Sequence, residues 1–144
     1  MLKNEKQYNS AKAKLEKWRK AKKQLRKDGL AGQADWLVGE QAFGIDQQIK
    51  QLSAEVKEYE DTVSGKLKLP DPTLISEIPR FLISWRIARH WTQRELADRV
   101  GMHENQIQKY ESEDYSCASL QTISNIAAAL KAGDGPQAKR RRAL

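Results

Sequence analysis

Cysteine is almost absent from this sequence: Cys117 is the only one in 144 residues. A single cysteine cannot form a disulfide within the chain, and it cannot build a cysteine-based metal site. A chain without disulfides suits a reducing compartment. We therefore expect a protein of the cytoplasm.

Long hydrophobic runs are also missing. No stretch approaches the roughly 20 consecutive apolar residues that a membrane span requires, and no apolar run follows the charged start at residues 1–6. Hydrophobic residues make up 39% of the chain, which is low for one thickly buried core. The sequence thus predicts a soluble, non-secreted protein without a membrane partner, built as one elongated helical domain or two small ones.

The residue groups that perform catalysis or hold a metal are missing too. The two histidines, His90 and His103, lie far from Cys117 and have no metal-ligand spacing. The glycines between residues 29 and 44 lack the preceding strand and the following Lys-Ser/Thr of a phosphate loop. No Ser, His and acid cluster suggests an activated nucleophile. We expect no enzyme, no metal and no cofactor.

Charge is unevenly distributed along the chain, whose net charge is +7. Residues 1–28 carry 11 basic and 3 acidic side chains, whereas residues 29–65 carry 2 and 7. Residues 66–79 are balanced, residues 80–132 have a net charge of +1, and residues 133–144 have +3. The overall excess favours a polyanionic partner.

The first segment, residues 3–27, contains no glycine or proline, and its apolar residues recur at intervals of four, three, three and four. They are Ala11, Leu15, Trp18, Ala21 and Leu25. This spacing predicts one long helix with a narrow apolar seam. Its many lysines and arginines are either a solvated face or a patch for nucleic acid or an anionic membrane.

A second long helix is predicted by a heptad seam in the acidic segment. Its members are Ile45, Ile49, Leu52, Val56, Tyr59 and Val63. We expect a turn near Asp28-Gly29, a helix that resumes around Asp35, and a stop at Ser64-Gly65. Matching seams and opposite charges predict an antiparallel hairpin within the chain, although the pattern also allows pairing between two chains.

The hairpin, residues 1–65, is followed by a connector, residues 66–78, and by a helical domain, residues 79–132. Ser76 or Ile78 is expected to cap that domain's first helix, with Pro79 in its first turn. This helix is expected to run to about His90, and Leu82, Ile83 and Trp85 to face the core. A last helix from Ser119 is expected to bury Leu120, Ile123, Ile126, Ala127 and Leu130. The tail, residues 133–144, has no core-forming residues and is expected to be disordered.

Residues 92–111 carry the pattern of two short helices joined by a tight turn. Thr92 and Glu95 form a predicted capping box at the start of the first helix. Leu96, Ala97 and Val100 mark its apolar face, and Gly101 can adopt the positive φ that ends it. Ile107 and Tyr110 mark the apolar face of the second helix.

Thr92-Gln93 followed by Leu96-Ala97, Gly101 and Ile107 resembles the Xre-type, phage-repressor-like family of helix-turn-helix proteins. The resemblance covers about residues 80–130. It implies a compact four- to five-helix lambda-repressor-like domain there. With the coiled-coil-like N-terminal helical hairpin that the heptad seams predict, the expected fold class is all-α. The resemblance also implies double-stranded DNA as the partner.

In a helix-turn-helix, the second helix enters the major groove and its first residues meet base edges. Helical spacing directs Glu104, Asn105, Gln108 and Lys109 away from Ile107. Asn and Gln can pair with adenine, Lys with guanine and Glu with cytosine. We predict that these four contact bases, although Glu104 would also repel phosphates.

Phosphate contacts are expected from Gln93, Arg94, Arg89 and Gln106. Gln93 opens the first helix of the motif, where backbone N–H groups can hold a phosphate. The resemblance places a phosphate contact at Gln93 too. It also implies that Arg86 pairs with Glu111, and we assign that ion pair to the fold rather than to DNA contact.

These features predict a sequence-specific, repressor-like transcriptional regulator that acts at the nucleoid, as a homodimer on a two-fold operator. Because the domain of residues 80–132 is close to neutral, doubling the contacts would raise its affinity for phosphates. The alternative is an antitoxin, whose hairpin binds a toxin protein while its helix-turn-helix autoregulates the operon.

Overall fold

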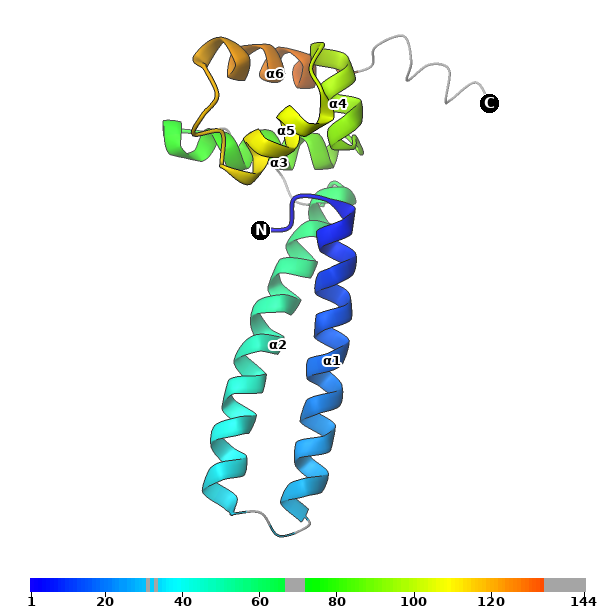
Figure 1. Cartoon of the computed structure of the whole chain (residues 1–144), viewed down its shortest axis with the longest axis vertical. Helices are drawn as coiled ribbons and strands as arrows, with labels where there is room; N and C mark the ends of the chain where they lie inside the picture. Colours follow the sequence, from blue (N-terminus) through cyan, green and yellow to red (C-terminus); the bar gives the residue numbers. More distant parts are fainter. Residues whose placement is uncertain (31, 33, 67–71, 134–144) are drawn as a thin grey trace, which may run out of the picture. The chain divides into compact units, whose positions relative to one another are not determined.

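A computed structural model describes residues 1–30, 32, 34–66 and 72–133. Every regular element in this part of the chain is a helix. The chain divides into two compact units, Met1–Asp61 and Thr62–Leu144 (Figure 1). The predicted all-α class is confirmed.

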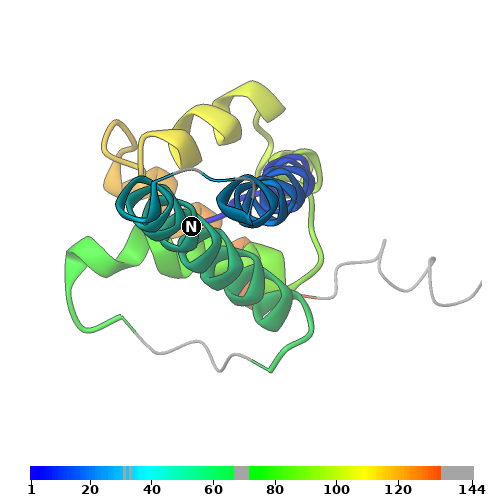
Figure 2. The same ribbon diagram turned by 90° about the horizontal axis from the view of Figure 1, so that it is seen from below.

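The first unit is an antiparallel hairpin of α1 (Glu5–Leu30) and α2 (Asp35–Val63), which lie side by side in Figures 1 and 2. Tyr8 donates its hydroxyl to Glu60 Oε1 at 2.6 Å. Lys22 Nζ lies 2.7 Å from Asp46 Oδ1. From the first contact to the second, the chain advances by fourteen residues in α1 and goes back by fourteen in α2, so the two helices are antiparallel. The predicted hairpin within the chain is confirmed.

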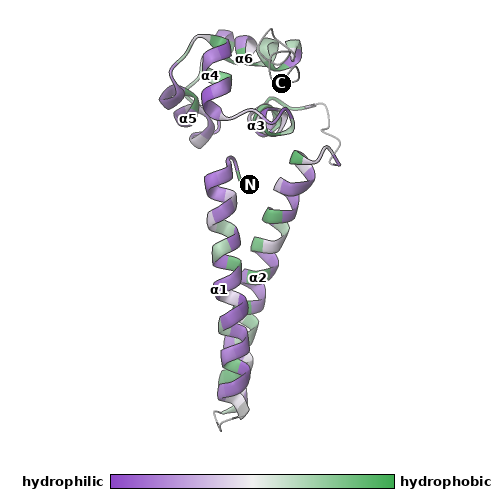
Figure 3. Ribbon diagram, turned by 90° about the vertical axis from the view of Figure 1, so that its right-hand side faces the viewer, coloured by the Kyte–Doolittle hydropathy of each residue, from purple (hydrophilic) through white to green (hydrophobic). Residues whose placement is uncertain are grey.

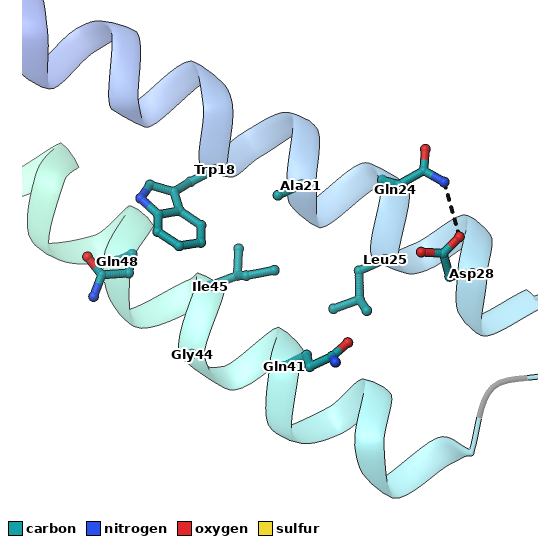
Figure 4. A pocket seen from close by; sticks show the side chains of 9 residues that line it. All are labelled: Trp18, Ala21, Gln24, Leu25, Asp28, Gln41, Gly44, Ile45 and Gln48. Atoms are coloured by element: carbon teal, nitrogen blue, oxygen red, sulfur yellow. Dashed lines mark hydrogen bonds between the residues drawn. The ribbon is translucent and has the colours of Figure 1, made fainter.

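The apolar seam lies between the two helices of this hairpin. Its buried members are Ala11, Leu15, Leu25 and Val56. Toward the tip of the hairpin, the side chains of Trp18, Leu25 and Ile45 point toward one another across the gap between the helices (Figure 4). The packing of this seam holds α1 and α2 together, as the heptad spacing predicted.

The prediction of a turn at Asp28-Gly29 is wrong, because α1 continues through Gly29 to Leu30. A Cβ built at Gly29 would lie 3.4 Å from Cγ1 of Val38, which is an ordinary van der Waals distance, so this end of α1 lies against α2. The packing of α1 on α2 opposes the helix-propensity penalty of about 1 kcal/mol for a glycine. The restart at Asp35 is confirmed, and Gly65, with φ +74°, follows the end of α2.

The second unit contains a short 3₁₀ turn, Ile75–Glu77, and four helices. These are α3 (Ile78–Ala88), α4 (Gln93–Val100), α5 (Glu104–Ser112) and α6 (Leu120–Ala132). They enclose a core of fully or almost fully buried side chains: Leu82, Ile83, Ile87, Leu96, Ala97, Ile107, Ile126 and Leu130. α4 packs against both α5 and α6, and α3 packs against α6.

The boundaries of α3 differ from the prediction. Its N-cap is Glu77, not Ser76 or Ile78, and the helix ends at Ala88 rather than at about His90, which has φ +58°. The Glu77 carboxylate accepts hydrogen bonds from the backbone N–H groups of Leu74 and Thr73. These bonds hold the pKa of Glu77 below its usual range, and they close the turn before α3.

One expectation about the core is wrong, and one core residue was not predicted. Leu120 is 78% exposed, because it is the first residue of α6 after the N-cap Ser119 and lies on the outer side of the helix. Tyr115, in the mostly polar segment 112–118 between α5 and α6, is only 3% exposed. Trp85, Ile123 and Ala127 are half-buried, while Ile87 is fully in the core.

Residues 67–71 of the connector and 134–144 of the tail lie outside the described residues.

Candidate nucleic-acid interface

A capping box and a glycine define the two ends of α4. The Thr92 hydroxyl accepts from the backbone N–H of Glu95 at 3.1 Å, and the Glu95 carboxylate accepts from that of Thr92 at 2.8 Å. Both halves of the predicted capping box are therefore present. At the other end of α4, Gly101 adopts φ +72° and ψ +33°, the left-handed conformation that ends a helix cheaply only at glycine.

α5 has one buried face and one exposed polar face. Ile107 and Glu111, four residues apart, are both 0% exposed and anchor the helix in the domain. The opposite side and the N-terminal turn carry the exposed polar side chains Glu104, Asn105, Gln106, Gln108 and Lys109. The structure therefore brings all four predicted base-contact residues together on one accessible surface.

The exposed face of α5 consists of two pairs of side chains, each one helical turn apart. In the first pair, Gln108 donates from Nε2 to Glu104 Oε1 at 3.2 Å. This bond offsets part of the acceptor capacity of the carboxylate and leaves Gln108 one N–H donor and its carbonyl oxygen. Asn105 and Lys109 form the second pair, and both are exposed. The face thus presents both donors and acceptors, as base readout requires.

Gln93 and Gln106 both use their side chains within the domain. Gln93 donates from Nε2 to Glu111 Oε2 at 2.7 Å, and is half-buried. The Gln106 Oε1 atom accepts from the backbone N–H of His103, the N-cap of α5, at 3.3 Å. The side chain of Gln93 therefore tethers the start of α4 to α5, and its backbone N–H remains in the first turn of α4.

The two predicted phosphate-binding arginines have different environments. Arg94 is exposed in the first turn of α4, beside the helix N-terminus that attracts anions. Arg89 is half-buried, and its guanidinium lies against Gly133 at the C-terminal end of α6. There it also complements the negative end of the helix dipole.

Arg86 and Glu111 form a two-pronged buried ion pair. Arg86 Nε lies 2.6 Å from Glu111 Oε1, and Arg86 Nη2 lies 2.8 Å from Oε2. The third nitrogen of the guanidinium donates to the carbonyl oxygen of Trp91 at 2.8 Å. Together with the bond from Gln93, this network ties α3, the loop before α4, and α4 itself to the C-terminal turn of α5.

One contact near this surface was not predicted from the sequence. The guanidinium of Arg99 lies 3.8 Å from the centre of the Trp91 ring, a cation–π arrangement. The only signal for it in the sequence is the spacing of eight residues between Trp91 and Arg99, since Trp91 directly precedes Thr92, the N-cap of α4. The contact braces the start of α4.

No group of three or more potential metal ligands lies together in the part of the chain that the structure describes. Cys117 is exposed, and its hydrogen bond to the Glu113 carboxylate raises the pKa of the thiol. A raised pKa keeps a thiol protonated and poorly nucleophilic. Among the described helices, none is long and apolar enough to cross a bilayer.

The second unit is thus a small helical domain built around two helices and a glycine turn, with a polar helix face exposed. Residues 82–133 match the helix-turn-helix family, and this part of the chain is an Xre-type, lambda-repressor-like helix-turn-helix domain. That domain is a DNA-binding fold with no enzymatic chemistry of its own, and it marks the chain as a DNA-binding regulator. No curated protein and no solved structure matches the chain.

Proposed function

We propose that this protein is a sequence-specific, repressor-like transcriptional regulator that inserts α5 into the major groove. The observation that carries the proposal is the division of α5 into a buried side, Ile107 and Glu111, and an exposed polar side. Asn105 and Lys109 are the principal base readers, to adenine and guanine respectively. Glu104 and Gln108, already hydrogen-bonded to each other, act as a second reading pair.

Contacts to the DNA backbone orient the domain in this proposal. The backbone N–H of Gln93 and the exposed guanidinium of Arg94 meet one phosphate at the start of α4. Gln106 and Arg89 are the remaining phosphate candidates, and each would have to loosen a contact within the domain to reach DNA. The Arg86–Glu111 pair holds α5 in place and does not touch DNA.

We further propose that the protein acts as a homodimer on a two-fold operator at the nucleoid. The domain of residues 80–132 has a net charge of only +1, so a single copy gains little from phosphate attraction. Two copies would address half-sites about 34–36 Å apart.

A dimer surface is suggested by the outer side of the hairpin. Trp36 and Phe43 of α2 are 69% and 66% exposed and lie seven residues apart, on the same side of the helix. By helical spacing this side is opposite to Ile45, which points toward α1. Exposed aromatic pairs of this kind mark protein interfaces. A second copy fits better here than against α1, because α1 has a net charge of +7 and would repel the α1 helix of another chain.

The same aromatic pair is the observation that favours the second candidate function, an antitoxin. In that case Trp36 and Phe43 would bind a toxin protein rather than a second copy. Co-purification of a small protein encoded beside this gene, lost when both aromatics are replaced, would favour the antitoxin over the simple regulator.

Footprinting on a bound operator fragment tests the role of α5. Asn105→Ala combined with Lys109→Ala should abolish protection, because each removes a base contact worth about 1–3 kcal/mol. Asn125→Ala combined with Lys131→Ala is the matched control, since it removes the same two exposed residue types from α6. Circular dichroism should show the same helicity in both variants.

Protection that persists in the α5 variant would overturn the assignment of the reading helix. Equal loss of protection in the α6 control would show that the effect comes from charge or folding and not from base contact.

A further inference from the structure

A row of four lysines lies on the side of α1 that faces away from α2. Lys17, Lys20, Lys23 and Lys27 follow at steps of three, three and four residues, so they share one helix face. By helical spacing this face is opposite to the buried Ala11. At 1.5 Å per residue the lysine row is about 15 Å long.

The lysine row is not used by the fold. All four side chains are exposed, and none of them forms an ion pair with any residue that the structure describes. Other basic groups of α1 do have partners: Lys22 pairs with Asp46 at 2.7 Å, and Arg19 with Glu16 at 3.4 Å. Like charges at such spacing destabilise a helix slightly. An anion placed along the row would relieve that repulsion.

The surrounding charge strengthens the row. Residues 1–28 have a net charge of +8, whereas residues 29–65, which hold α2, have −5. Both helices are solvated, and α1 is coloured hydrophilic over most of its length in Figure 3. Solubility would be served equally well by mixed charges on both helices. The segregation of positive charge onto one helix instead creates a directed field for a polyanion.

We propose that the lysine row binds the phosphate backbone of duplex DNA without regard to sequence. This proposal rests on the proposed function, because the same chain carries the helix-turn-helix domain. Duplex DNA carries one negative charge per roughly 1.7 Å of axis, so a row about 15 Å long meets several phosphates. The row adds the phosphate attraction that the nearly neutral domain lacks, and it holds the chain on DNA while α5 searches for its site.

An anionic membrane is a poorer match than DNA. Interfacial helices bury an apolar face in the lipid beside their basic face. In α1 the apolar side chains Ala11, Leu15 and Leu25 are already buried. The side with the lysine row carries no large apolar residue to insert, since its other members from residue 13 onward are Ala13, Glu16 and Gln24.

The test measures binding of the full chain to a labelled duplex of about 30 base pairs with an arbitrary, unselected sequence, between about 50 and 200 mM salt. The variant Lys20→Gln with Lys27→Gln removes two members of the row. The variant Lys50→Gln with Lys57→Gln removes two exposed lysines from α2 and changes the net charge equally. Glutamine has nearly the helix propensity of lysine, so both variants should keep their helices.

In the α1 variant, the slope of log affinity against log salt should be less steep by about 1.8, or about 0.9 per lost phosphate contact. The α2 variant should change it by much less than one. Replacing all four lysines of the row should make the slope less steep by about 3.6. The inference is overturned by equal slopes in the α1 and α2 variants. Tighter binding to RNA or to anionic lipid vesicles than to duplex DNA, lost in the α1 variant, would also overturn it.

Failure of this inference differs from failure of the proposed function. If the Asn105→Ala, Lys109→Ala variant keeps its sequence preference while the α1 variant shows the expected reduction of its salt slope, the lysine row binds DNA and α5 does not read it. If the Asn105→Ala, Lys109→Ala variant loses its sequence preference while the α1 variant keeps the slope of the wild type, α5 reads DNA and the lysine row is only a solvated face.

Discussion

At the scale of single residues, the buried pair of Arg86 and Glu111 is the feature whose disruption should cost the most stability. Both side chains are almost completely buried, at 2% and 0% exposure. Glu111→Ala should lower the free energy of unfolding of the helix-turn-helix unit by about 3–5 kcal/mol, because it leaves the Arg86 charge buried without its partner. Denaturant unfolding followed by circular dichroism measures the change.

Removing both charges separates the attraction from the burial of a lone charge. Arg86→Met together with Glu111→Leu should cost less than the two single substitutions added together. Arg94→Met, on an exposed arginine, should stay within about 0.5 kcal/mol of the wild type. Additive costs for the pair would contradict the coupling that the 2.6 Å contact implies.

Tyr115 is a buried tyrosine whose hydroxyl has no hydrogen-bond partner among the described residues. Burial and the nearby Glu111 carboxylate raise the pKa of the Tyr115 hydroxyl. The folded state therefore holds this proton more tightly than the unfolded state. The stability that results is fully present below the usual tyrosine pKa of about 10 and is lost as pH rises beyond it.

Tyr115→Phe should consequently be as stable as the wild type or slightly more stable at neutral pH, because the hydroxyl it removes is unsatisfied. Above about pH 10 the wild type should lose stability relative to the variant. Thermal unfolding of both proteins across this pH range is the measurement. Parallel curves at all pH values would show that the hydroxyl is not buried as described.

At the scale of elements, the hairpin should be a folded unit by itself. α1 has 26 residues and α2 has 29, so a fragment of residues 1–65 should give a strongly helical circular dichroism spectrum. Leu15→Lys, at a buried seam position, should reduce that helicity, whereas Ala13→Lys, at an exposed position, should not. A random-coil spectrum of the unsubstituted fragment would contradict the packing of α1 on α2.

The sequence predicted elements well where the signals are local. The capping box of Thr92, the glycine at 101 and the heptad seams are properties of a few neighbouring residues, and the helices begin and end accordingly. The misplaced turn at Gly29 shows the limit, because α1 continues through this glycine, where it lies beside Val38 on the other helix. Contacts between distant residues decide such cases.

The candidate site shows the same division. Helical spacing was enough to place Glu104, Asn105, Gln108 and Lys109 on one exposed face. It could not show that the Gln93 side chain is engaged by Glu111, which lies 18 residues further along the chain. Nor could it show that Tyr115, in a polar segment, turns inward beside Tyr110. Those side chains are placed by the tertiary packing of the domain.

At the scale of the whole molecule, the proposed homodimer should depend on the exposed aromatics of α2. Trp36→Glu with Phe43→Glu should shift the protein from dimer to monomer in sedimentation equilibrium, because charges would replace the apolar contact area. Ala13→Glu with Gln24→Glu changes the charge equally on exposed positions of α1 and should leave the dimer intact. A wild type that stays monomeric at high concentration would rule out the dimer.

Selection of bound sites from a pool of random duplexes tests the central claim most directly, namely that the exposed face of α5 reads DNA sequence. The wild type should enrich a palindromic site whose two halves lie about one helical turn, 34–36 Å, apart. The variant Asn105→Ala with Lys109→Ala should lose that enrichment, whereas Asn125→Ala with Lys131→Ala should keep it. No enriched site with the wild type, or the same site enriched by the α5 variant, would contradict the account.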